Sequence, residues 1–75
     1  MLKLPLLSSA ELRRFLEHEG FSCVRQKGSH CFYRHPDGRT TVVPVHAKKD
    51  IGRGLLLAIL EDIKMERDEF LQKLK

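Results

Sequence analysis

A short run of residues, Lys27, Gly28, Ser29 and His30, brings an ammonium group, a flexible backbone, a hydroxyl and an imidazole to the start of a predicted strand. His46 follows just beyond the end of the next predicted strand. Cationic side chains and backbone amides bind phosphate oxygens, and an imidazole transfers protons near neutral pH. The spacing therefore predicts a site that handles phosphate.

The size of the chain limits the kind of site that it can build. A chain of 75 residues buries only about 60% of the surface that it exposes when unfolded. We therefore expect one domain over 1–75, with its chemistry on a surface or in a shallow groove. A nucleic acid suits such a site, because a large substrate supplies much of the contact area itself.

Positive charge is concentrated in the middle of the chain. Fourteen Lys and Arg against ten Asp and Glu give a formal net charge of +4. The basic residues of this middle part are Arg25, Lys27, Arg34, Arg39, Lys48, Lys49 and Arg53, against Asp37 and Asp50. Such a stretch is typical of phosphate binding, since each neutralised phosphate releases counterions. A generally basic, solvated surface explains the composition equally well.

Local signals predict the first helix over 9–19. Ser8 and Glu11 have the spacing of a capping box at its start. Gly20 followed by Phe21 predicts a Schellman closure at its end.

Three strands are predicted after this helix, over 21–27, 29–35 and 40–45. Alternation of side chains places Cys23 and Arg25 on the same face of the first strand. Pro36-Asp37-Gly38 has the residue order of a type I turn with a glycine bulge, which makes the last two strands an antiparallel hairpin. A two-residue turn at Asp37-Gly38 remains an alternative, and it would shift the register by one residue.

A second helix is predicted from the N-cap Asp50 to Ile63, and a short last helix over 67–73. Gly52 and Gly54 in the first turn allow close approach of another group to the backbone, either the sheet or something outside the chain. Leu56, Leu57 and Leu60 widen the apolar surface and suggest a partner surface. The last helix returns Phe70, Leu71 and Leu74 to the core. These elements predict an α+β fold in which both main helices cover one face of the sheet and leave the other open.

Several motifs of this chain match one protein family in order and spacing: Gly20-Phe21, Arg25 to His30, His35 to Arg39, Val43 to His46 and Ile51 to Leu60. With them the chain resembles the HicA-type, or YcfA-like, toxins of bacterial and archaeal toxin–antitoxin pairs, over nearly its whole length. The resemblance implies a fold like a double-stranded-RNA-binding domain. It also implies a small ribonuclease that cleaves mRNA without a metal or cofactor and is inhibited by a HicB-type antitoxin.

The same resemblance implies that His30 is the catalytic histidine. We expect His30 to act as general base on the ribose 2′-hydroxyl, or as the sole acid–base group with water completing the proton cycle. Arg25 and Lys27 would hold the scissile phosphate, and Gly28 and Ser29 would bind its nonbridging oxygens.

The other histidines have less defined roles. His46 is either a second proton-transfer group or a strand-end residue that positions the loop. His18 and His35 are expected on a helix surface and in a turn.

Metal and thiol chemistry fit the sequence poorly. The spacings of Cys23, His30, Cys31, His35 and His46 do not match known zinc sites, so no metal site is expected. Adjacent Cys31 and His30 point to opposite faces of a strand, which excludes a thiol–imidazole pair. Two cysteines make no disulfide framework, so we expect both thiols to be reduced.

The sequence contains neither a signal peptide nor an apolar stretch long enough to cross a membrane, and we expect a soluble, cytoplasmic protein.

Two functions besides the ribonuclease toxin remain open. One is a non-catalytic RNA-binding module of the same fold, in which His30 only contacts RNA. The other is a protein-interaction domain that docks a regulator through leucines of the second helix.

Overall fold

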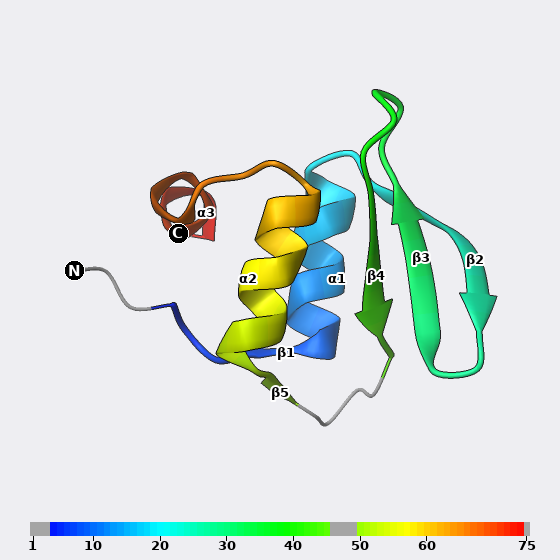
Figure 1. Cartoon of the computed structure of the whole chain (residues 1–75), viewed down its shortest axis with the longest axis horizontal. Helices are drawn as coiled ribbons and strands as arrows, with labels where there is room; N and C mark the ends of the chain where they lie inside the picture. Colours follow the sequence, from blue (N-terminus) through cyan, green and yellow to red (C-terminus); the bar gives the residue numbers. More distant parts are fainter. Residues whose placement is uncertain (1–3, 46–49, 75) are drawn as a thin grey trace.

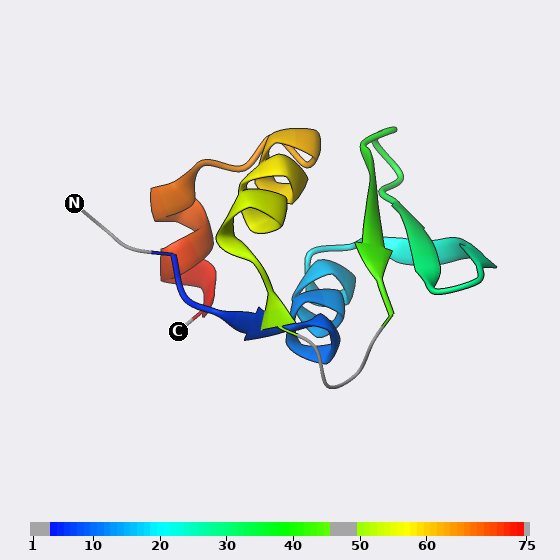
Figure 2. The same cartoon turned by 60° about the horizontal axis from the view of Figure 1, so that its bottom comes forward.

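The computed structural model describes residues 4–45 and 50–74. The elements follow in the order β1 (Leu7–Ser8), α1 (Ser9–His18), β2 (Ser22–Lys27), β3 (His30–Arg34), β4 (Thr40–Pro44), β5 (Asp50–Ile51), α2 (Arg53–Asp62) and α3 (Arg67–Leu74). Strands β2, β3 and β4 form an antiparallel sheet, and α1 and α2 lie on the same side of it (Figure 1, Figure 2). The predicted α+β class is confirmed, with the element order of a double-stranded-RNA-binding domain and an added short C-terminal helix.

Helix α1 begins and ends as its sequence predicts. The Ser8 hydroxyl accepts a hydrogen bond from the Glu11 backbone N–H at 3.1 Å, and the Ser8 N–H donates to the Glu11 carboxylate at 3.0 Å. The hydrogen bond from the Ser8 backbone N–H to this carboxylate is the largest cause that lowers the pKa of Glu11. At the other end Gly20 has a φ of +99°, and the Phe21 N–H donates to the Leu16 carbonyl at 2.9 Å. The Schellman closure is therefore present.

The β3–β4 hairpin has the predicted turn and register. The Gly38 N–H donates to the His35 carbonyl at 2.9 Å, and Gly38 has a φ of +100°. His30 lies opposite Pro44 in β4. The alternative two-residue turn at Asp37-Gly38 is absent, because the His35 N–H donates to the Arg39 carbonyl and leaves three residues in the loop.

Strand β2 departs from simple alternation. Cys23 pairs with Tyr33, whereas Arg25 pairs with Phe32, so Val24 is an extra residue in a β-bulge. The bulge reverses the facing of the residues before it. The prediction that Cys23 and Arg25 share a face is therefore wrong.

The bulge also brings the two cysteines together. Cys23 now faces the same side as Cys31, their Cα atoms lie 6.0 Å apart, and they form a disulfide. That separation is within the ordinary range for a disulfide. The expectation of two reduced thiols is wrong for this structure. Cys31 is buried and Cys23 is exposed, so a reductant in solvent can reach the bond from the β2 side.

The start of the second helix differs from the prediction. Asp50 is not its N-cap: Asp50 and Ile51 form β5, which pairs with Ser8 and Leu7 of β1. The helix begins at Arg53, with Gly52 as its N-cap and no side chain capping it. The small β1–β5 ladder accounts for the difference, because it keeps Asp50 in an extended conformation.

The core lies between the sheet and the helices. Its largest fully buried side chains include Leu12 and Leu16 of α1, Tyr33 of β3, Leu56 of α2 and Phe70 of α3. Burial, and then the nearby Glu17 carboxylate, raise the pKa of Tyr33. No helix within the described residues has the length and apolar character needed to cross a membrane.

Helix α3 closes the core on the side away from the sheet (Figure 1). The Phe70 ring meets the Phe15 ring edge to face, with centroids 4.9 Å apart. Lys73 forms an ion pair with Glu19 at 2.7 Å, and that hydrogen bond raises the pKa of Lys73. The predicted return of the last helix to the core is confirmed, although Leu71 and Leu74 are only partly buried.

Candidate active site

The turn between β2 and β3 places the predicted cation and imidazole opposite one another. Lys27 and His30 are directly paired across the ladder, with Gly28 and Ser29 as the two turn residues. Gly28 has a φ of +58°, whereas the φ of Ser29 is not positive. This combination defines a type II′ turn, which requires glycine at its first central position.

The same turn borders a shallow hollow of about 340 Å³. Its lining comes from the starts of α1 and α2, from β5, and from the sheet end: Ser9, Ser29, His30, Pro44, Asp50, Ile51 and Leu55. Two contacts fix the sheet side of this hollow. The Ser9 hydroxyl donates to the Pro44 carbonyl, and the Val45 N–H donates to the Ser29 carbonyl at 2.6 Å. Because His30 is exposed at the rim of this hollow, an extended substrate can reach it.

The charged side chains of β2 beside the turn are positive, whereas Asp50 lines the hollow on its other side. Arg25 and Lys27 are both exposed on β2, and neither takes part in an ion pair among the described residues. Their cations are therefore free to bind an anion from solvent. Of the predicted phosphate-binding residues, the structure brings Lys27, Gly28 and Ser29 beside His30, with Arg25 further along β2. His46 lies outside the described residues.

The two glycines at the start of α2 do not pack against the sheet. A Cβ added at Gly52 or at Gly54 would meet no atom within 4 Å. Of the two explanations for these glycines, close contact with the sheet is therefore wrong. Access for a group from outside the chain stays a prediction.

The remaining histidines lie where the sequence suggested. His18 is exposed at the end of α1, and His35 precedes the β3–β4 turn. The His35 Nδ1 accepts the Asp37 backbone N–H at 3.1 Å, while its ring packs against Phe21 with centroids 5.0 Å apart. His35 thus stabilises the turn. Among residues 4–45 and 50–74, no three or more His, Cys, Asp or Glu side chains are grouped to hold a metal ion.

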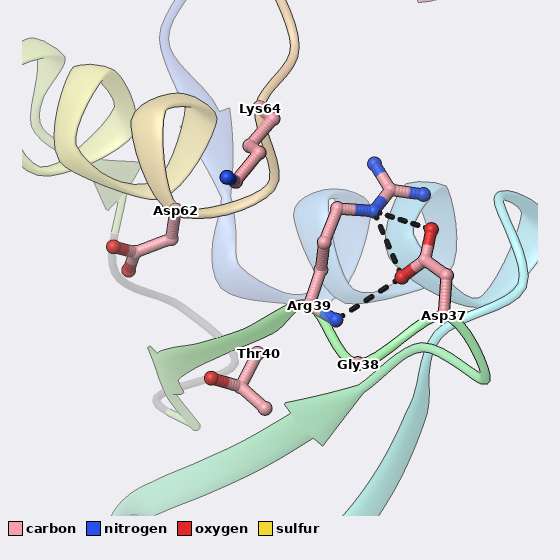
Figure 3. Close-up of a pocket in the computed structure, with 6 residues that line it drawn as sticks. All are labelled: Asp37, Gly38, Arg39, Thr40, Asp62 and Lys64. Atoms are coloured by element: carbon pink, nitrogen blue, oxygen red, sulfur yellow. Dashed lines mark hydrogen bonds and ion pairs between the residues drawn. The ribbon is translucent and has the colours of Figure 1, made fainter.

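A second hollow, of about 640 Å³, lies beside the β3–β4 turn (Figure 3). Asp37 points toward Arg39, whose Nε lies 2.8 Å from the carboxylate, and the Arg39 guanidinium also donates to the Ile63 carbonyl at 2.5 Å. The bond from the Arg39 backbone N–H, and then the one from its guanidinium, lower the pKa of Asp37. These contacts tie the turn to the end of α2, so the Pro-Asp-Gly motif has a structural role.

Sequence reasoning missed two parts of the site region. Ser9, Asp50 and Leu55 line the hollow beside His30 but come from elements that the sequence did not place there. Phe32 was read only as a strand residue, although it is exposed on the same row as His30. A signal for Phe32 was present, because it occupies the phase of β3 opposite to buried Cys31 and Tyr33.

The fold is that of a known family of small toxins, and the matched part of the chain includes the turn between Lys27 and His30. The family model described as "HicA toxin of bacterial toxin-antitoxin" matches residues 9–65. The chain therefore belongs to the HicA toxin family. It is 35% identical over 57 residues to the probable mRNA interferase HicA of Pseudomonas fluorescens (strain Pf0-1), and the alignment covers 76% of this chain and 93% of that protein. Helix α3 lies beyond the part that the family model matches.

Proposed function

We propose that this chain is the ribonuclease toxin of a toxin–antitoxin pair, which cleaves mRNA through His30 without a metal ion. The observation that carries the proposal is the direct pairing of Lys27 with His30 across a two-residue turn, at the rim of an open hollow. Membership of the HicA family and the name of the similar Pseudomonas protein support the choice of mRNA as substrate.

The chemistry follows from the groups around the turn. His30 takes the proton from a ribose 2′-hydroxyl, the 2′-oxygen attacks phosphorus, and the bond from phosphorus to the 5′-oxygen breaks. The leaving oxygen receives a proton from water or from protonated His30, and a cyclic phosphate remains on the other fragment. Lys27, with Arg25, neutralises the charge that develops on the phosphate, and Ser29 binds a nonbridging oxygen. Gly28 has no side chain to obstruct that approach.

Replacing His30 by alanine tests the proposal, with His18→Ala as matched control because His18 is also an exposed histidine. Purified protein free of antitoxin is incubated with a transcript in the presence of a chelator. We expect wild type and His18→Ala to cleave equally, and His30→Ala to lose cleavage by about 100-fold or more. RNA cleavage that survives in His30→Ala, or that requires added zinc or magnesium, would contradict the proposal.

A non-catalytic RNA-binding module is the second candidate function. The observation that favours it is the exposure of Arg25 and Lys27 on β2, which form no ion pair with any described residue and would bind RNA with or without cleavage. Wild-type protein that binds the transcript but leaves it intact under every condition supports this alternative. Binding of RNA without cleavage, with an affinity that falls as the salt concentration rises, would then be the activity of this protein.

We further propose that a HicB-type antitoxin inhibits the toxin by covering the hollow beside His30. Apolar side chains on α2 offer part of its contact surface. Leu55 and Leu57 are 41% and 42% exposed, whereas Leu56 and Leu60, also predicted for this surface, are buried in the core. Copurification of the pair, followed by an RNA cleavage assay, tests this proposal. A complex that still cleaves RNA at the wild-type rate would refute it.

A further inference from the structure

The face of the sheet turned away from the helices carries an exposed aromatic ring. Phe32 in β3 and Val42 opposite it in β4 are each 36% exposed, and Val24 is 62% exposed. No described element packs on this side of the sheet (Figure 2). Exposed apolar side chains gathered on one surface usually mark a binding site.

The bulge in β2 creates this cluster. Because Val24 is the extra residue and Arg25 pairs with Phe32, both are placed beside the aromatic ring. A shallow hollow of about 430 Å³ runs over the cluster, and its lining includes Val24, Arg25, Phe32, Arg34 and Val42. We call these five residues the Phe32 face.

The charge of the sheet selects the chemistry of a ligand. Strands β2, β3 and β4 contain no Asp or Glu, whereas Arg25, Lys27 and Arg34 are all exposed. None of these three cations takes part in an ion pair among the described residues. An aromatic ring between free cations on an acid-free sheet is suited to a polyanion with flat apolar rings, and single-stranded nucleic acid is such a polymer.

We propose that the Phe32 face binds the unpaired strand next to the cleaved bond, with one base stacked on Phe32 and a flanking phosphate held by Arg25 or Arg34. This inference rests on the proposed ribonuclease function and adds the class of substrate: single-stranded RNA. A base inside a duplex has both of its faces covered by neighbours, so it cannot stack on a protein side chain.

The register supports continuity between this face and the active site. His30 and Phe32 belong to the exposed row of β3 and are two residues apart, which corresponds to roughly 7 Å along a strand. A neighbouring base of an extended strand can span that distance. The base on Phe32 therefore belongs to a nucleotide close to the one whose phosphate lies at His30, and Phe32 helps to fix where cleavage occurs.

The test measures binding of a short RNA whose 2′-hydroxyls are all methylated, so that no attack by the 2′-oxygen is possible. The variants are Phe32→Ala, Phe32→Leu and Phe32→Tyr, with Leu6→Ala as control because Leu6 is an exposed apolar residue outside the three-stranded sheet and outside the proposed antitoxin surface. We expect Phe32→Ala and Phe32→Leu to weaken binding of the unpaired strand about five- to 100-fold. Phe32→Tyr and Leu6→Ala keep the wild-type affinity. The wild type binds the same RNA more weakly as a duplex than as an unpaired strand, and Phe32→Ala reduces this difference.

Phe32→Leu is the decisive variant, since leucine keeps the apolar surface but removes the ring. Wild-type affinity of Phe32→Leu for the unpaired strand would overturn the proposal, as would equal affinity of the wild type for strand and duplex. Unchanged RNA binding with loss of antitoxin binding would assign the face to a protein instead. Thermal unfolding of each variant confirms that it is folded.

A separate readout distinguishes this inference from the proposed function. With unmodified RNA we expect Phe32→Ala to raise KM and to leave kcat near the wild-type value, whereas His30→Ala removes cleavage. If wild-type protein cleaves no RNA, the ribonuclease proposal fails. The binding measurements then still decide whether Phe32 stacks on an unpaired base.

Discussion

Helix α3 is held by one aromatic side chain, and replacing Phe70 by alanine should expose how much of the fold depends on it. Phe70 is fully buried and is the one buried residue of α3. Truncating a buried phenylalanine to alanine costs about 3–5 kcal/mol. A chain of 75 residues has a free energy of unfolding of roughly 4–11 kcal/mol. The substitution should therefore remove roughly a quarter or more of the stability.

Urea unfolding followed by circular dichroism measures this loss. Lys73→Ala is the matched control on the same helix, because it removes the exposed ion pair with Glu19 and leaves Phe70 in place. We expect Lys73→Ala to change the urea midpoint little, since surface ion pairs contribute little to stability. A loss below about 1 kcal/mol for Phe70→Ala would refute the reasoning. It would mean that α3 is dispensable and that the packing of Phe70 against Phe15 is not what stabilises the domain.

Two further predictions concern the sheet. Reducing the disulfide should lower the free energy of unfolding by roughly 2–3 kcal/mol, which is the loop-entropy value for a cross-link between residues eight apart. The Cys23→Ser variant should unfold at the same urea concentration as the reduced wild type. Equal urea midpoints of the wild type with and without reductant would contradict this prediction. Folding lowers the pKa of Asp37, so the ionised carboxylate contributes fully to the free energy of unfolding above the ordinary aspartate value of 3.8. This contribution is lost as the pH falls through the lower pKa of the folded protein. The stability difference between wild type and Asp37→Asn should therefore be largest near neutrality and shrink in acid, and a constant difference in unfolding curves across this range would count against the role given to Asp37.

The sequence alone determined the elements whose signals are local. The capping box at Ser8 and Glu11 and the left-handed Gly20 involve groups within a few residues of one another, so the bounds of α1 are predictable to one residue. The Pro-Asp-Gly turn likewise set the register of β3 on β4. The sequence placed Lys27 and His30 in one site because they belong to the same short run of residues, and the two-residue turn between them then sets them opposite one another.

Only the tertiary structure decided the features that depend on distant partners. Asp50 looks like an N-cap in isolation, but pairing of Asp50 and Ile51 with β1 keeps this segment extended. The bulge at Val24 leaves no signal in the sequence, yet it reverses the facing of Cys23 and brings it to Cys31. Burial on one side of the sheet and exposure of Phe32 on the other depend on where both helices pack. Local patterns fix the backbone conformation of short segments, whereas the contacts that segments make across the fold decide which side chains remain available for binding.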